Sequence, residues 1–145
     1  MENRIDIEQV EPRAFKAMYG LEDYLQKSAL SKVHLELIKI RASQINGCAF
    51  CINMHTSDAL QQGESARRIF LLNAWRETEL FDEAEKTILA MTEEITLIQQ
   101  GGLSDQVYKE AKEVFEENYI AQIIMAIVTI NAWNRIAIST QRIVK

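Results

Sequence analysis

Two cysteines and a histidine lie close together in the chain, and their types and spacing are those of a thiol redox site. They are Cys48, Cys51 and His55, and they follow the turn sequence Asn46-Gly47. On a helix that rotates about 100° per residue, the three side chains fall within an arc of about 60°. A helix N-terminus and a neighbouring imidazole both favour the thiolate, which is the nucleophilic form of cysteine. The motif therefore predicts reactive thiols on one face of a helix.

His55 lies one helical turn beyond Cys51, and its imidazole is suited to accept the thiol proton. An unperturbed imidazole has a pKa of about 6.5, so it exchanges protons near neutral pH. A carboxylate that reached the same place would orient the ring and extend the proton relay. Glu36 is the candidate, because it borders the apolar stripe of the preceding helix. The alternative is a surface role for Glu36, paired with Lys32 or Lys39 at helical spacing.

The elements around this motif are expected to be helices throughout. Apolar residues recur with a spacing near 3.6, whereas sustained alternation with a period of two is missing. Phe15, Met18 and Leu21 are expected to face the core from the first helix, and Leu30, Val33, Leu37 and Ile40 from the second. The expected helices run from Pro12 to about Lys27, from Ser28 or Ser31 to about Gln44, from Cys48 to Gln62, from Glu64 to about Trp75, from Asp82 to the Gly101-Gly102 break, from Asp105 to Asn118, and from Tyr119 to about Arg142.

The composition indicates one ordered domain over residues 1–145. Apolar residues make up 48% of the chain and charged residues 26%, with one proline and five glycines. The net charge of −5 disfavours nucleic acid as a partner. The longest apolar run, Ile123 to Val128, is far shorter than the roughly 18 residues of a membrane span, so no membrane is expected. The charged N-terminal residues lack the apolar segment of a secretory signal, so we expect the cytosol, where thiols stay reduced.

Other interpretations of the two cysteines remain open. They can be small buried apolar residues. Together with His55 they can bind zinc, although no fourth ligand is evident. A thioredoxin fold is excluded, because no βαβ pattern precedes the motif and the only proline, Pro12, cannot supply the cis-proline that faces the thiols in that fold.

Several other residues are expected to be structural. His34 is expected to be a partly exposed helix residue without a functional role. Arg135 lies in an apolar helix and is expected to pair with an acid. Large rings at helical spacing usually bury area, so core or interface positions are expected for Trp75, Phe81 and Trp133. The apolar arc of the last helix is too wide for a solvated helix, which indicates a central helix or a subunit interface.

The sequence resembles the AhpD-like alkylhydroperoxidases of the carboxymuconolactone decarboxylase superfamily. Glu36 and the C-x-x-C-x-x-x-H motif carry the resemblance, and it extends to residues 73–78, 81–85 and 131–135. The resemblance implies an all-helical fold and a homo-oligomer, as a dimer, trimer or hexamer. It also implies peroxide reduction in which Cys51 becomes a sulfenic acid and Cys48 resolves it as a disulfide, while His55 and Glu36 pass protons.

One position departs from this pattern. Phe50 stands where the mycobacterial enzymes of the family carry a further histidine, so one member of their relay is missing. The departure leaves open how efficient the peroxidase is and which reductant serves it. Decarboxylation is disfavoured, because the decarboxylases of the superfamily lack the dithiol pattern, and a shared fold does not imply a shared reaction.

The sequence thus predicts a cytosolic, all-α, homo-oligomeric thiol peroxidase that reduces hydroperoxides. The expected partners are a small-molecule hydroperoxide and a thiol or protein reductant that the motifs do not identify. Neither a metal nor an organic cofactor is expected. Helix-terminus electrostatics alone favour Cys48 as the attacking thiol, but His55 and the family resemblance favour Cys51. The alternatives are a metal-binding or structural oligomer without peroxidase turnover and a protein disulfide reductase.

Overall fold

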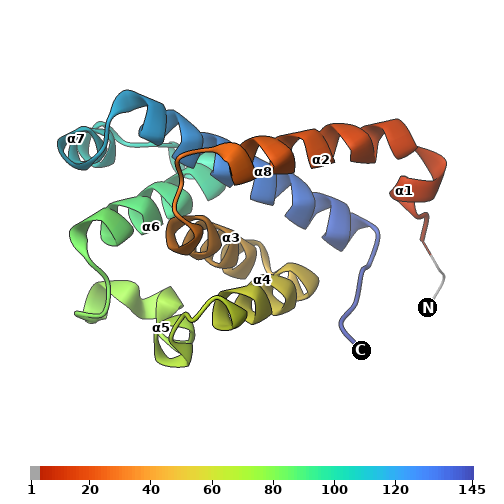
Figure 1. The fold of residues 1–145 in the computed structure, drawn as a ribbon, viewed down its shortest axis with the longest axis horizontal. Coiled ribbons are helices and arrows are strands. Elements are labelled where there is room, and N and C mark those ends of the chain that lie inside the picture. The colour runs from red at the N-terminus through yellow and green to blue at the C-terminus, as the bar shows by residue number, and fades with distance from the viewer. Residues whose placement is uncertain (1–3) are drawn as a thin grey trace.

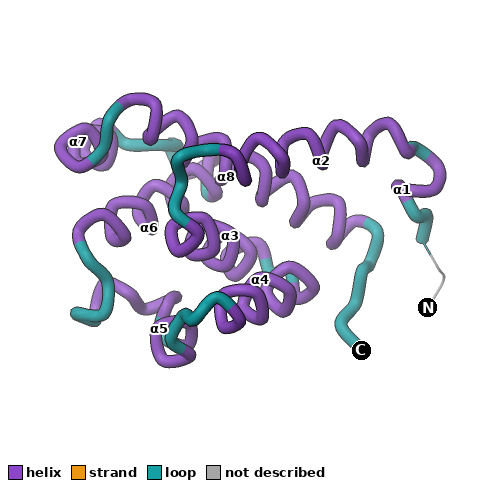
Figure 2. The backbone as a smooth tube through the Cα atoms, in the orientation of Figure 1, coloured by secondary structure: helices purple, strands orange, loops and turns teal. Residues whose placement is uncertain are grey.

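The computed structural model describes residues 4–145, and within that range the chain forms helices and loops but no strand (Figures 1 and 2). The all-α class expected from the sequence is confirmed. The elements are α1 (Ile7–Val10), α2 (Pro12–Lys27), α3 (Lys32–Asn46), α4 (Ala49–Gln61), α5 (Ala66–Phe70), the 3₁₀ helix η1 (Leu72–Glu77), α6 (Glu83–Thr96), the 3₁₀ helix η2 (Ile98–Gln100), α7 (Asp105–Val114) and α8 (Glu117–Ser139).

Short polar side chains fix where several helices begin. Ser31, rather than Ser28, caps α3, and its hydroxyl accepts a hydrogen bond from the His34 amide at 3.1 Å. Asp82 and Glu85 form a reciprocal capping box at the start of α6, with amide to carboxylate distances of 2.8 and 2.9 Å. Such caps satisfy amide groups that have no partner inside the helix. The helix starts that rest on these local signals were therefore predictable.

Three expected helix ends are wrong. Of the helix expected over residues 64–75, the α-helical part ends at Phe70. The chain then forms the 3₁₀ helix η1, in which the backbone of Ala74 is not helical, with φ −118°. The helix expected over residues 105–118 stops at Val114, because Phe115 is extended and its ring stacks on Tyr119 at 5.0 Å between centroids. α6 ends at Thr96, before the glycine pair. The break at Phe115 accompanies a contact with the next helix, and such tertiary contacts override helix propensity.

The core is centred on α3 and α8. All residues from 35 to 40 of α3 are buried, so this helix is enclosed on nearly every side. This differs from the expected stripe, because Val33 is 45% exposed. α8 packs against α2, α3, α4 and α6 and crosses the middle of the molecule (Figure 1). Its expected central position is confirmed.

By length and composition alone, α8 is also apolar enough to cross a membrane, contrary to the expectation from the longest apolar run. In the described fold, 44% of its apolar stretch is buried inside the domain. Its contacts with α2, α3, α4, α6 and α7 are those of the core helix of a globular protein.

Candidate active site

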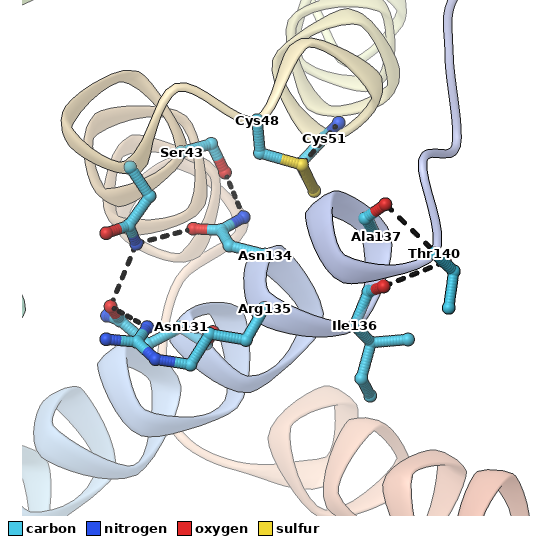
Figure 3. The surroundings of a disulfide bond; sticks show 10 residues. Ser43, Cys48, Cys51, Asn131, Asn134, Arg135, Ile136, Ala137 and Thr140 are labelled. Carbon is cyan, nitrogen blue, oxygen red and sulfur yellow. Dashed lines mark hydrogen bonds between the residues drawn. A yellow bond between two sulfur atoms is a disulfide. The ribbon is translucent and has the colours of Figure 1, made fainter. Parts of the chain in front are cut away.

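The two cysteines lie at the junction between α3 and α4. Gly47 ends α3 in the left-handed region with φ 69°, a conformation that suits glycine. Cys48 is then the N-cap of α4, and its sulfur accepts the amide hydrogen of Cys51 at 3.3 Å. The two cysteines form a disulfide bond, with their Cα atoms 5.3 Å apart (Figure 3). The turn therefore places the dithiol at a helix N-terminus, as the sequence predicts.

A buried network of amide side chains anchors this turn to α8. Asn134 is 0% exposed and donates a hydrogen bond to the Ser43 hydroxyl at 2.9 Å (Figure 3). Asn46 donates to the side-chain oxygens of Asn134 and Asn131, each at 2.9 Å. Buried polar groups that are fully paired specify one arrangement of their helices. The network thus fixes where α4 begins.

Within residues 4–145, Arg135 pairs with no acid, contrary to the expectation. Its side chain is exposed, and its Nη1 donates to the backbone and side-chain oxygens of Asn131, at 3.1 and 3.0 Å. An exposed guanidinium keeps its hydration and needs no carboxylate to balance a buried charge.

Glu36 and His55 meet inside the protein. The distance between Glu36 Oε2 and His55 Nδ1 is 3.2 Å, and the two residues are 8% and 7% exposed. The ring is not aligned for a hydrogen bond, and neither atom has another hydrogen-bond partner in the described part of the chain. The alternative surface role for Glu36 is wrong, since Lys39 instead contacts Glu22 at 3.3 Å. Buried polar atoms without a partner are uncommon in proteins and call for an explanation.

A cavity of about 410 Å³ opens beside Cys51 and His55. Cys51, His55 and Ala59 follow one another at single-turn spacing on the buried face of α4. Cys48 does not line this cavity, and it borders a separate shallow groove beneath the C-terminal segment. The two sulfurs therefore differ in access to the cavity. It is lined by Phe15, Tyr19, Glu22, Gln26, Glu36, Lys39, Phe50, Cys51, Met54, His55, Asp58, Gln62, Trp133, Ile136, Ala137 and Arg142.

Aromatic rings form much of the cavity wall. Phe15 of α2 and Trp133 of α8 pack edge to face at 5.4 Å between centroids. Trp133 also donates its indole hydrogen to Glu22 at 3.0 Å. The Arg142 guanidinium lies over the rings of Phe15 and Phe50, at 5.6 and 5.7 Å. Spacing predicted only a core or interface role for Trp133, and no sequence signal placed these aromatic residues around one space.

Tyr19 adds a polar group to this wall. Its hydroxyl donates to Glu8 of α1 at 3.3 Å. Desolvation, together with the neighbouring Glu8 carboxylate, raises the pKa of the Tyr19 phenol. The hydroxyl therefore stays protonated and remains a hydrogen-bond donor at neutral pH.

The remaining residues singled out from the sequence lie away from the cavity. Trp75 and Phe81 are 6% and 3% exposed, which confirms their core positions. His34 is partly buried, as expected, and its Nδ1 lies 2.6 Å from the Tyr119 hydroxyl. Burial lowers the pKa of His34, although the Glu85 and Asp82 carboxylates act in the opposite direction.

The metal ligands considered from the sequence are not assembled in this form of the protein. Cys48 and Cys51 are bonded to each other, so their sulfurs are not available as thiolate ligands. A different set of donors lies beside them. Ligand atoms of Glu36, His55 and Asp58 all lie within 4.8 Å of one another.

Comparison with known proteins agrees with this architecture. The family model for the carboxymuconolactone decarboxylase family matches residues 12–94. The uncharacterized protein YdfG of Bacillus subtilis is 41% identical over 139 residues, which cover 96% of this chain and 95% of YdfG.

Solved structures share the fold. A crystal structure from Agrobacterium tumefaciens, of a protein of unknown function provisionally described as the antioxidant defence protein AhpD, superposes with a TM-score of 0.95 and 38% identity over 99% of both chains. The debrominase Bmp8 has a TM-score of 0.84 at 16% identity, over 94% of this chain and 74% of its own, and at that identity it shows the fold alone. The sequence match and the fold thus agree, and the chain belongs to the carboxymuconolactone decarboxylase family as an AhpD-like member.

Proposed function

We propose that this protein is a cytosolic thiol peroxidase that reduces organic hydroperoxides through Cys51 and Cys48. The observation that carries the proposal is the position of Cys51. Cys51 lines a cavity that is large enough for a small organic molecule, and the buried pair of Glu36 and His55 lines the same cavity. Cys48 is bonded to Cys51 but does not line the cavity. Family membership and the AhpD-like structural neighbour support an oxidoreductase of this kind.

The reaction begins with the reduced dithiol. His55 accepts the proton of Cys51, and the thiolate attacks the terminal peroxide oxygen. The O–O bond breaks, Cys51 becomes a sulfenic acid, and the departing alkoxide takes a proton from the imidazolium to leave as an alcohol. The Glu36 carboxylate lies 3.2 Å from the ring, where its negative charge offsets the positive charge that the ring gains in this step.

Resolution uses the second cysteine. The Cys48 thiol loses its proton and attacks the Cys51 sulfur, so that the S–S bond forms while the S–O bond breaks and water leaves. One hydroperoxide and two thiols thereby give one alcohol, one water and one disulfide. A small thiol that enters the cavity returns the pair to the reduced state by thiol–disulfide exchange.

The burial of both cysteines favours a small substrate. Cys48 and Cys51 are 1% and 2% exposed, so a disulfide on the surface of another protein cannot reach them in this conformation. A small hydroperoxide needs only to enter the cavity. This observation favours peroxide reduction over the alternative of a protein disulfide reductase.

Titration of free thiols in the reduced protein tests the proposal. Addition of one equivalent of cumene hydroperoxide should consume both thiols and release one equivalent of alcohol, and dithiothreitol should sustain turnover. A variant with both cysteines changed to serine is the control and should consume no hydroperoxide. Persistence of both thiols in excess hydroperoxide would refute the peroxidase and leave a metal-binding or structural role.

A further inference from the structure

We infer that Glu36, His55 and Asp58 form a binding site for a divalent transition metal, of which Zn²⁺ is the preferred ion. The three residues offer one imidazole nitrogen and two carboxylates, with ligand atoms within 4.8 Å of one another. All three line the cavity that Cys51 faces. This set shares His55 with the cysteine-based set but has two carboxylates in place of the sulfurs, so it remains available when the sulfurs are bonded to each other.

Two of the donor atoms are buried and have no hydrogen-bond partner among residues 4–145. They are Glu36 Oε2 and His55 Nδ1, 3.2 Å apart, in residues that are 8% and 7% exposed. Zinc holds nitrogen and oxygen ligands at about 2.0 to 2.2 Å, so the donors of a tetrahedral site lie roughly 3.4 Å from one another. The buried pair already has nearly that separation. Asp58 is at least partly exposed, so its side chain is free to move the remaining distance.

The local charge also favours a cation. Two carboxylates and a neutral imidazole carry a formal charge of −2, which one divalent ion balances. The nearby basic groups are engaged elsewhere, since Lys39 contacts Glu22 and Arg142 lies over aromatic rings. The imidazole donor favours zinc over magnesium and calcium, which prefer oxygen ligands alone.

Metal binding would have a consequence for the proposed chemistry. An ion on Glu36 and His55 occupies the two groups that are proposed to move the proton of Cys51. Zinc should therefore slow the oxidation of the dithiol by hydroperoxide. This consequence rests on the proposed function, whereas the binding itself does not.

Calorimetric titration of the oxidised, untagged protein with zinc chloride tests the site. In the disulfide form the cysteine sulfurs cannot act as thiolate ligands. Any zinc that binds this form is therefore held by other donor atoms. We expect one Zn²⁺ per chain and affinities at least about tenfold weaker in Asp58→Asn and His55→Gln, since even the loss of an outer partner of a metal ligand has an effect of this size. Magnesium chloride should give no binding.

The chain offers matched controls for both changes. His34→Gln removes the only other histidine, and Asp105→Asn removes an exposed carboxylate at the start of α7. Both variants should bind zinc like the unchanged protein, and zinc should raise the thermal midpoint of unfolding in each. Because Asp58 lies at the edge of the cavity, Asp58→Asn keeps the test informative even where His55→Gln fails to fold.

Three results would overturn the metal site. They are no zinc binding by the oxidised protein, binding that Asp58→Asn leaves unchanged, and equal loss of binding in His34→Gln. The expected inhibition of dithiol oxidation by zinc is tested separately. Zinc that binds stoichiometrically but leaves the rate of thiol oxidation unchanged would overturn the inhibition and the acid–base role of Glu36 and His55, while the metal site would stand.

Discussion

Cys48 and Cys51 have the same side chain, but the surroundings of their sulfur atoms differ. The sulfur of Cys48 accepts an amide hydrogen at the start of α4, an environment that stabilises negative charge. The side chain of Cys51 faces the cavity that His55 and Glu36 also line. Electrostatics at the helix end alone would make Cys48 the stronger nucleophile, but a nucleophile also needs access to its substrate. We therefore expect access to decide in favour of Cys51.

The acid–base role of Glu36 predicts the effect of one substitution. In Glu36→Gln, oxidation of the reduced dithiol by cumene hydroperoxide should slow by roughly 100-fold, because an amide neither carries the proton nor stabilises the imidazolium. Stopped-flow measurement of the rate between pH 5 and 9 should also show a changed pH profile. Glu113→Gln alters an exposed carboxylate on α7 and should react like the unchanged protein. A Glu36→Gln rate equal to that of this control would remove Glu36 from the mechanism.

At the scale of elements, three helices hold the site in place. α3 contributes Glu36, α4 contributes Cys51 and His55, and α8 anchors the turn between them through Asn134. The turn is short because Gly47 reverses the chain in one residue with a positive φ. The geometry of the dithiol therefore depends on polar contacts outside the motif.

The Asn134→Ala substitution tests this dependence. It removes the hydrogen bond to the buried Ser43 hydroxyl and one of the two acceptors of the Asn46 amide, so the free energy of unfolding should fall by about 1 to 3 kcal/mol. Urea unfolding followed by circular dichroism measures the change, and Asn118→Ala, at an exposed position, is the control. If both variants unfolded at the same urea concentration, the network would have no role in stability.

Some elements of the fold could be predicted from the sequence, and others could not. Helix starts that depend on a local cap, such as those at Ser31, Asp82 and Ser104, follow from a few adjacent residues. The contact between Glu36 and His55 was expected from the packing of two consecutive helices together with the family resemblance, which favoured this contact over a surface role for Glu36. The break at Phe115 was not, because it depends on a ring that stacks on the next helix.

The cavity could not be predicted from the sequence. Its wall combines side chains from α2, α3, α4, α8 and the C-terminal segment, several of which are far apart along the chain. Local periodicity does not determine how such segments pack together.

At the scale of the whole molecule, stability should depend on the protonation of His34. This residue joins the start of α3 to α8 through its contact with the Tyr119 hydroxyl at 2.6 Å. Burial lowers its pKa in the folded protein, whereas an unfolded histidine has a pKa of about 6.5. Between those two values the unfolded chain binds more protons than the folded one. The contribution of His34 to stability is therefore complete above pH 6.5 or so and declines as the pH falls toward the folded-state pKa.

The His34→Gln variant should remove this part of the pH dependence. Urea unfolding at pH 7.5 and pH 5.5 measures it, and the loss of stability on acidification should be smaller in the variant than in the unchanged protein. His55→Gln, with the same change at the other histidine, tests whether the effect belongs to His34. Parallel pH profiles for the unchanged protein and His34→Gln would contradict the lowered pKa.

Assembly is a separate expectation at this scale. Several large apolar side chains remain exposed on the single chain, including Phe70 at 77%, Ile138 at 46% and Val128 at 45%. Exposed apolar surface of this kind is often covered in oligomers. Light scattering at micromolar concentration should give a multiple of the 16.7 kDa chain mass. A mass equal to one chain would contradict the expected homo-oligomer and leave the thiol chemistry unaffected.

The central claim is that Cys51, and not Cys48, attacks the peroxide. Trapping with dimedone, which reacts with sulfenic acids, measures this most directly in Cys48→Ser and Cys51→Ser treated with one equivalent of cumene hydroperoxide. A dimedone adduct should form on Cys51 of the Cys48→Ser variant, and none should form on the Cys51→Ser variant. An adduct on Cys48 of the Cys51→Ser variant, formed at the full rate of the unchanged protein, would contradict it.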